Sequence, residues 1–361
     1  ELVPGTRSLF LTSGRGAEQH CWRAVADFET AQVPATPWHG LRNKVMFGPR
    51  SLAAAERTAN LVNWFRPHVV VGLGSYNCVV PVAIARAMGR PAVLMASDVI
   101  PGKAVRALAP LVSRVLVQWE DARNHLPAGR VRVTGNPIRR RLHQSTRHGA
   151  RERLGLSEHK CTLLAMGGSQ GARAVNEALY EAMPMLESHA EWLQVLHLAG
   201  PQNVDEALAR TKASTLRCHT LGFMDRMEDA YAAADFVLCR AGGSTLAEVT
   251  AMGLPSILVP YPHHKDRHQS ANARVLQNAA AAVVIEEKDL SPVRLATSIR
   301  SLTDNAALRG WMGRRARELA QPLAARNAAI EIAQLGGFEA REEPKPQPIL
   351  EIIHEQLSQA A

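Results

Sequence analysis

One stretch, residues 239–272, constrains the fold of this chain more than any other. It follows an apolar run and contains a glycine turn at 241–243, a helical segment, a short β-type run at 256–259 and a polar loop that opens a further helix. Ser244 or Thr245 is predicted to cap the first helix. A helix N-terminus after such a turn offers N–H groups and a positive dipole end to an anion. The pattern therefore predicts an anion-binding turn at the carboxyl edge of an α/β sheet.

Polar side chains accompany this turn. Glu248, one helical turn further on, can accept hydrogen bonds from a pair of sugar hydroxyls, whereas the simpler interpretation is a solvated helix carboxylate. His264 and His268 are spaced four residues apart, which also suits a metal ion, but no third ligand recurs at a useful spacing, so no metal is expected. We interpret the loop from His263 to Gln269 as one that reads hydroxyl groups, and the stretch as part of a nucleotide-sugar site.

Strand and helix alternate along the whole chain, and the pattern restarts once. Apolar strand-like runs occur at 9–12, 69–72, 92–95, 115–118, 131–134, 162–166, 193–199 and 236–239. Such alternation predicts an α/β fold with two doubly wound, Rossmann-like domains that face a cleft. We expect an N-terminal domain at 1–137, a C-terminal domain at 138–335, and a linker with a short amphipathic tail at 336–361.

Composition narrows the class of protein. Hydrophobic residues make up 46% of the chain and aromatic residues only 5%, which favours an α/β protein over an all-β one. No apolar run approaches the roughly 20 residues that span a bilayer, and no secretory signal is recognisable. The five cysteines are scattered without metal-binding spacing, so free thiols in a cytosolic protein are expected.

The positive charge is concentrated in the first part of the chain. Residues 1–148 hold 20 Lys and Arg against 8 Asp and Glu, whereas the remainder holds 22 against 25. A basic half is typical of proteins that bind nucleic acid, an anionic membrane surface or a phosphate ligand. Because no nucleic-acid motif accompanies the charge, we expect a membrane surface and phosphates rather than nucleic acid. A solvated basic surface without a partner is the alternative.

Several motifs in fixed order carry a resemblance to a known family. They are GNPIR (135–139), GGSQGARAVNE (167–177), GFMDRMEDAYAAAD (222–235), RAGGSTLAEVTAMGLPSILVP (240–260) and HKDRHQSANA (264–273). With these motifs the chain resembles the undecaprenyl-diphospho-muramoylpentapeptide β-N-acetylglucosaminyltransferases of peptidoglycan synthesis. That family, glycosyltransferase family 28, has the GT-B fold and forms lipid II. The resemblance extends from about residue 60 to about residue 335.

The resemblance implies roles on the donor side. Ser169 and Gln170 would contact the diphosphate of UDP-GlcNAc, and Arg139 would lie near the sugar nucleotide. Met224 occupies the position at which the family's backbone contacts uracil, and Glu248 would bind the ribose hydroxyls. Glycine turns at helix N-termini stabilise a leaving diphosphate without a metal or another cofactor, so none is expected.

Further implied contacts concern the sugars. His268 and Gln269 occupy the positions that read the GlcNAc hydroxyls, and Thr245 is a further candidate substrate-binding residue. The reaction implied is an inverting transfer of GlcNAc to the C4 hydroxyl of undecaprenyl-diphospho-MurNAc-pentapeptide. Such an enzyme would be peripheral on the cytoplasmic face of the plasma membrane, with a lipid-diphosphate acceptor and an anionic membrane surface as partners.

Departures from the family fall on the acceptor side. The family's GGTGGH loop, whose His is often proposed as the general base, lies upstream of residue 1, so we expect a first domain truncated at its start. The family's HEQN segment is here Met95-Ala96-Ser97-Asp98. Asp98 is a candidate acceptor-side residue and substitute base, or else a helix cap before Pro101. A transferase with another lipid acceptor and a non-catalytic UDP-sugar-binding protein therefore remain alternatives.

Overall fold

The computed structural model describes residues 2–14, 28–34, 41–168, 171–264 and 266–339. Two compact units are present: unit 1 comprises residues 1–93, 111–113 and 326–361, and unit 2 comprises residues 94–110 and 114–325. The domain boundary at residue 137 stays a prediction. The amphipathic helix expected in the tail lies outside the described residues.

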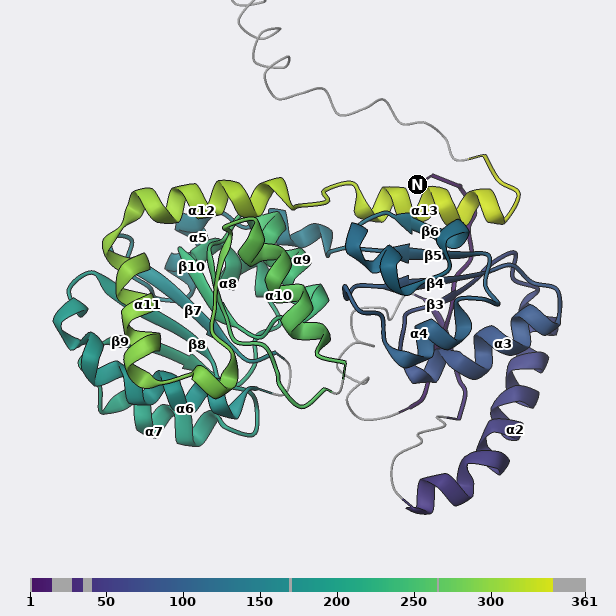
Figure 1. Ribbon diagram of the computed structural model, residues 1–361, viewed down its shortest axis with the longest axis horizontal. Helices are drawn as coiled ribbons and strands as arrows, with labels where there is room; N and C mark the ends of the chain where they lie inside the picture. Colours follow the sequence, from purple (N-terminus) through teal and green to yellow (C-terminus); the bar gives the residue numbers. More distant parts are fainter. Residues whose placement is uncertain (1, 15–27, 35–40, 169–170, 265, 340–361) are drawn as a thin grey trace, which may run out of the picture. The chain divides into compact units, whose positions relative to one another are not determined.

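The elements follow one another in an alternating order (Figure 1). Up to residue 143 they are β1 (Leu9–Thr12), β2 (Glu29–Gln32), α2 (Leu41–Phe65), β3 (Val70–Gly72), η2 (Tyr76–Cys78), α3 (Val79–Ala87), β4 (Ala92–Ala96), α4 (Lys103–Leu108), β5 (Arg114–Val117), η3 (Glu120–His125), η4 (Ala128–Arg130), β6 (Val131–Val133) and η5 (Arg140–His143). Thereafter they are α5 (Arg147–Arg153), β7 (Cys161–Met166), α6 (Arg173–Ala182), η6 (Met183–His189), β8 (Leu193–Leu198), α7 (Val204–Lys212), β9 (Arg217–Leu221), α8 (Met227–Ala233), β10 (Phe236–Cys239), α9 (Gly243–Met252), β11 (Ser256–Leu258), α10 (His268–Asn278), β12 (Ala282–Val284), η7 (Glu287–Asp289), α11 (Pro292–Asp304), α12 (Ala306–Glu318) and α13 (Ala324–Leu335).

A six-stranded sheet organises unit 2. Its strand order is β12-β11-β10-β7-β8-β9, and every neighbouring pair is parallel. The chain runs outward from β7 to β9 on one side and from β10 to β12 on the other, so the order reverses between β7 and β10. This is the doubly wound arrangement of dinucleotide-binding folds, with its topological switch point at that pair of strands.

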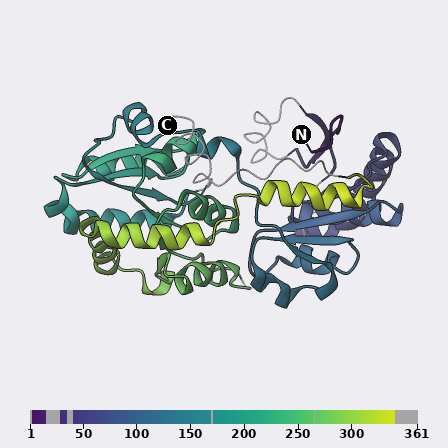
Figure 2. The ribbon, with the colours of Figure 1, turned by 90° about the horizontal axis from the view of Figure 1, so that it is seen from above.

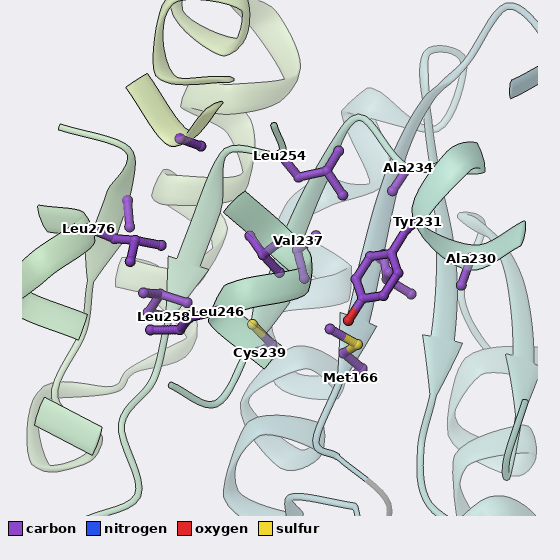
Figure 3. Packing of buried hydrophobic residues seen from close by; sticks show 14 of the residues in the cluster. Met166, Ala230, Tyr231, Ala234, Val237, Cys239, Leu246, Leu254, Leu258 and Leu276 are labelled. Carbon is purple, nitrogen blue, oxygen red and sulfur yellow. The ribbon is translucent and has the colours of Figure 1, made fainter. Parts of the chain in front are cut away.

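Helices cover both faces of this sheet (Figure 1, Figure 2), and the side chains of its strands point alternately into the two cores. Leu164, Met166 and Cys239 belong to one core, which α5, α8, α9, α10 and α12 complete (Figure 3). Leu163 and Leu238 belong to a second core on the other face, where α6, α7 and α11 pack. Two apolar layers around one sheet fix the positions of the loops at its carboxyl edge.

The remaining strands form smaller sheets. β1 and β2 make a parallel two-stranded sheet, and the other sheet has the order β3-β4-β5-β6, with β5 and β6 parallel. Near β1 and β2, a small core includes Ala54 and Leu61 of α2. That helix continues through Pro49.

One buried cation holds α5 against the sheet of unit 2. Arg151 is fully buried, and its guanidinium donates to Thr162 Oγ1, to the Asp235 carboxylate and to four backbone carbonyls. Asp235 also accepts from the backbone N–H of Thr162 at 2.7 Å and pairs with the half-exposed Arg147 at 2.7 Å. Full hydrogen bonding makes this burial of charge tolerable.

The two arginines that share Asp235 should differ in their effect on stability. Arg151→Met removes the buried cation that pairs with Asp235 and donates to four backbone carbonyls, so we expect the free energy of unfolding to fall by about 3–5 kcal/mol. Arg147→Met removes an exposed partner of the same carboxylate and should cost less than about 1 kcal/mol. Urea unfolding monitored by circular dichroism measures both, and equal losses would contradict this assignment.

Candidate active site

The candidate site lies at the switch point of the sheet in unit 2. Met166 at the end of β7 is in register with Cys239 at the end of β10, so the loops that follow the two strands start side by side. Open α/β sheets bind their ligands outside the carboxyl ends of the strands, at the point where the strand order reverses. The loops 167–172 and 240–242 therefore define where a ligand is expected.

The loop after β7 admits only glycine at two of its positions. A Cβ on Gly171 would lie 2.4 Å from the carbonyl oxygen of Ala199, and one on Gly167 would lie 2.1 Å from the Ala172 nitrogen. Gly171 also has a φ of +77°, which disfavours other residues. The turn leads directly into α6. Ser169 and Gln170, the predicted diphosphate contacts, lie outside the described residues.

The loop after β10 differs from the sequence-based expectation. α9 begins at Gly243, its N-cap is the extended Gly242, and no side chain of the turn caps it. The prediction that Ser244 or Thr245 caps this helix is therefore wrong. The reason is that the Gly243 N–H donates to Asp98 Oδ1 (3.3 Å), a carboxylate supplied from 145 residues away. Thr245 is half-buried in the first turn, and its contact with substrate stays a prediction.

Asp98, Asn272 and the backbone of Val99, Ala241 and Gly243 form one hydrogen-bonded cluster in unit 2, which we call the latch. Asp98 Oδ1 also accepts from Asn272 Nδ2 at 2.7 Å, and the same nitrogen donates to the Ala241 carbonyl at 2.9 Å. Asn272 is fully buried and accepts from the Val99 N–H at 2.8 Å. A Cβ on Gly243 would meet the Ser97 carbonyl oxygen at 2.4 Å. Asp98 is therefore held by two donors and stabilises the start of α9.

Glu248 shares a polar cluster with two residues from other segments. The hydroxyl of the buried Tyr231 donates to Glu248 Oε2 at 2.8 Å. Burial raises the pKa of the Glu248 carboxyl, while the Tyr231 hydrogen bond and the positive charge of Arg139 act in the opposite direction. Ile138, beside Arg139, and Met224 both pack against the core that contains Tyr231. The fold thus brings the charge of the predicted site residue Arg139 near the Glu248 carboxylate, and it packs Met224 against the core that holds Tyr231.

The polar loop before α10 is tied to the turn after β10. Gln269 Oε1 accepts from the backbone N–H groups of Ala241 (3.2 Å) and Tyr261 (3.0 Å). The amide oxygen of Gln269 is thus engaged with protein, and its nitrogen is the group able to donate to a sugar hydroxyl. With the bond from Gly243 to Asp98, two N–H groups of the turn after β10 contact protein oxygens.

A histidine pair stands at the start of α10. The His268 Nδ1 lies 2.7 Å from Asp266 Oδ1, which fixes the ring and directs Nε2 away from the carboxylate. The ring centroids of His264 and His268 are 4.4 Å apart. Burial, followed by the neighbouring His268, lowers the pKa of His264, so the neutral ring is favoured there. Across the described part of the chain, no three His, Cys, Asp or Glu side chains are grouped to hold a metal ion.

Two contributing residues were missed by sequence reasoning. Tyr231 lies within the motif at 222–235, but helical spacing gave it no polar role. Asn272 follows His268 by four residues, so its position on the same face of α10 was a usable signal. Its partners Asp98 and Val99 lie more than 170 residues away, which no local pattern reveals.

Comparison with known proteins places this geometry in a family. Residues 162–326 match the C-terminal domain of glycosyltransferase family 28. A crystal structure of MurG from Acinetobacter baumannii superposes with a TM-score of 0.71 at 26% identity, covering 91% of this chain and 92% of that one. The fold is therefore that of a GT-B glycosyltransferase, as the sequence predicted.

Two relatives define the family more narrowly. Both are named UDP-N-acetylglucosamine–N-acetylmuramyl-(pentapeptide) pyrophosphoryl-undecaprenol N-acetylglucosamine transferase. The one from Halothermothrix orenii is 36% identical over 345 residues, with 91% of each chain covered. The one from Anaeromyxobacter sp. is 36% identical over 335 residues, covering 90% of this chain and 84% of the relative. The chain belongs to this family of N-acetylglucosamine transferases, and it is an enzyme of the glycosyltransferase class.

The latch and the general-base hypothesis for Asp98 make opposite predictions. Asp98→Asn keeps an oxygen that can accept from Gly243 and Asn272, so we expect kcat within about threefold of the unchanged enzyme. Loss of a general base instead lowers kcat by roughly 10²–10⁴-fold. Asp98→Ala should lower the melting temperature, which Asp98→Asn should preserve. Steady-state kinetics and calorimetry distinguish the two roles. A loss of kcat by roughly 10²-fold or more in an Asp98→Asn enzyme with an unchanged melting temperature would support Asp98 as the general base.

Proposed function

We propose that this chain transfers GlcNAc from UDP-GlcNAc to the C4 hydroxyl of undecaprenyl-diphospho-MurNAc-pentapeptide, the step of peptidoglycan synthesis that converts lipid I to lipid II. The observation that carries the proposal is a partly buried carboxylate, Glu248, one turn into the helix that follows the switch point. The names of the relatives supply the substrates, and the Rossmann-like sheet of unit 2 supplies a nucleotide-binding edge.

The donor is assigned to the carboxyl edge of this sheet. The glycine turn after β7, with Ser169 and Gln170, would receive the diphosphate at the start of α6. The backbone near Met224 would contact uracil, and Glu248 would accept hydrogen bonds from the ribose hydroxyls. Thr245 and Arg139 are assigned to the same nucleotide.

The GlcNAc ring would lie by the loop before α10. His268 Nε2 and the amide nitrogen of Gln269 are the groups we assign to its hydroxyls. Asp266 holds His268 at Nδ1, and the Ala241 and Tyr261 N–H groups hold Gln269. Both side chains are therefore fixed before the sugar binds, which lowers the entropic cost of recognition.

The chemistry requires one displacement. The acceptor C4 oxygen forms a bond to the anomeric carbon of GlcNAc, the bond from that carbon to the diphosphate oxygen breaks, and UDP leaves with the electron pair. The proton of the attacking hydroxyl must pass to a base. Because the donors around Asp98 are structural, we assign this base to a group other than Asp98. The positive end of the α6 dipole would stabilise the charge that develops on the leaving diphosphate.

Transfer to defined acceptors tests the proposal and its alternatives. With UDP-GlcNAc and undecaprenyl-diphospho-MurNAc-pentapeptide we expect one GlcNAc per acceptor and an equal amount of UDP, measured by mass spectrometry. Turnover of a glycolipid without the diphosphate would instead support another lipid acceptor. Calorimetric binding of UDP-GlcNAc with no transfer to either acceptor would support a binding protein. No binding of UDP-GlcNAc would overturn all three.

The role of Glu248 predicts a dependence on pH. An ionised carboxylate is a stronger acceptor for ribose hydroxyls than a protonated one, and burial raises the pKa of this group. The affinity for UDP should therefore be full above that pKa and decline as the pH falls through it. Glu248→Gln should raise the KM for UDP-GlcNAc by roughly 10–100-fold and abolish the acidic decline, since a charged hydrogen bond is worth about 1.5–3 kcal/mol. The exposed Glu181 on α6 offers a control, and Glu181→Gln should change neither property.

Binding at an anionic membrane surface is proposed for unit 1. None of the described helices is both long and apolar enough to cross a bilayer. On α2, however, Leu52 and Trp64 are 73% and 64% exposed, the exposed Arg57 lies on the same helix, and the exposed Arg66 directly follows it. Arg57 and Trp64 also line a cavity of about 530 Å³ against β2. Exposed apolar and basic side chains on one helix are typical of peripheral membrane attachment, which we assign to the cytoplasmic leaflet.

Two exposed tryptophans allow a matched test of this surface. Trp64→Ser should weaken binding to vesicles that contain phosphatidylglycerol by about tenfold, because a large apolar side chain is removed from the bilayer interface. Trp192→Ser changes a 48% exposed tryptophan of unit 2 and should leave binding intact. Cosedimentation gives both values. Equal vesicle binding by the two variants would contradict the assignment of α2 to the membrane-binding surface.

A further inference from the structure

Tyr231 places a polar group inside an apolar core. The residue lies on α8, it is only 2% exposed, and its ring packs in the same cluster as Met166, Cys239 and Leu246 (Figure 3). A phenylalanine would fill this space equally well, and burying a hydroxyl without a hydrogen-bond partner costs free energy. The location of that partner indicates what the hydroxyl does.

The partner is the carboxylate assigned to the ribose. Tyr231 donates to Glu248 Oε2 at 2.8 Å, and among the described residues no protein group donates to Oε1. A phenol has a single O–H, so this bond orients one carboxylate oxygen toward the core. The second oxygen is then left for a ligand.

Charge keeps the bond in this direction. Burial raises the pKa of Tyr231 well above its ordinary value, and the negative charge of Glu248 raises it further, so the phenol remains a donor. The charge of Arg139 acts on both groups and favours their ionised forms. The Tyr231 hydrogen bond lowers the pKa of Glu248 and thereby helps to keep the carboxylate ionised despite its burial.

We propose that Tyr231 is a positioning residue for donor recognition: it fixes the Glu248 carboxylate so that the enzyme selects a ribonucleotide over a 2′-deoxyribonucleotide. The inference rests on the proposed role of Glu248 in binding the ribose. Tyr231 makes no contact with substrate itself. A carboxylate held in one orientation loses less conformational freedom when the ribose hydroxyls bind.

Tyr231→Phe tests this role, because it keeps the ring and removes only the donor. We expect the KM for UDP-GlcNAc to rise about tenfold while kcat stays within about twofold, since a hydrogen bond to a charged group is removed from ground-state binding. Preference for UDP-GlcNAc over its 2′-deoxyribose analogue, as a ratio of kcat/KM values, should fall by a similar factor. In a Glu248→Gln background, Tyr231→Phe should have little further effect on either quantity.

A second buried tyrosine supplies the control. Tyr180 of α6 is 6% exposed, packs in the core on the opposite face of the sheet, and has a buried hydroxyl without a hydrogen-bond partner among the described residues. Tyr180→Phe should leave the ribose preference unchanged.

Three results bear against the proposal, and one of them separates it from the proposed function. A lower melting temperature of Tyr231→Phe with unchanged ribose preference would make Tyr231 purely structural. Full additivity with Glu248→Gln would show that the two side chains act independently. If Glu248→Gln alone leaves the ribose preference unchanged, the assignment of Glu248 fails and the role of Tyr231 fails with it, whereas transfer of GlcNAc to the lipid acceptor is still judged by its own assay.

Discussion

The parallel pairing of β7 with β10 is the constraint on which the rest of the site depends. These strands are adjacent although β8, β9 and three helices separate them in the chain. Both faces of the sheet are buried by helices, so the loops at its carboxyl edge are where backbone can meet a ligand. Met166 opposite Cys239 brings the start of α6 and the start of α9 to the same place. The glycine turn after β7 and the helix that carries Glu248 therefore both start at the carboxyl edge of the sheet, beside this pair of strands.

Hydrogen bonds from side chains give the two sides of this region different chemistry. In the turn after β10, the Ala241 N–H donates to Gln269 and the Gly243 N–H donates to Asp98. The Ala241 carbonyl accepts from Asn272. These bonds hold the turn in place, and two of its N–H groups contact protein oxygens. We therefore assign the leaving diphosphate to the turn after β7 and the neutral hydroxyls of ribose and GlcNAc to the side chains beside β10. This assignment follows from the bonds that the Ala241 and Gly243 N–H groups make to protein oxygens, whereas the sequence pattern offered both turns to an anion.

The sequence predicted the sheet well and the latch not at all. β1 and β10 have the predicted bounds, because apolar runs that end at turn residues carry a local signal. β2 was missed because its residues, Glu29–Gln32, are largely polar. The cap of α9 was wrong for a different reason: local propensity favours Ser and Thr, but the carboxylate that meets Gly243 comes from Asp98. Roles at Glu248, His268 and Gln269 came from resemblance to a family, and their orientation required the fold.

The central claim is that UDP binds at the β7–β10 switch point of unit 2. A crystal structure of the enzyme with UDP-GlcNAc tests it most directly. We predict the diphosphate against the glycine turn at 167–171 and a ribose hydroxyl within hydrogen-bonding distance of the Glu248 carboxylate. Nucleotide density elsewhere, with Glu248 still bonded only to Tyr231, would contradict this account.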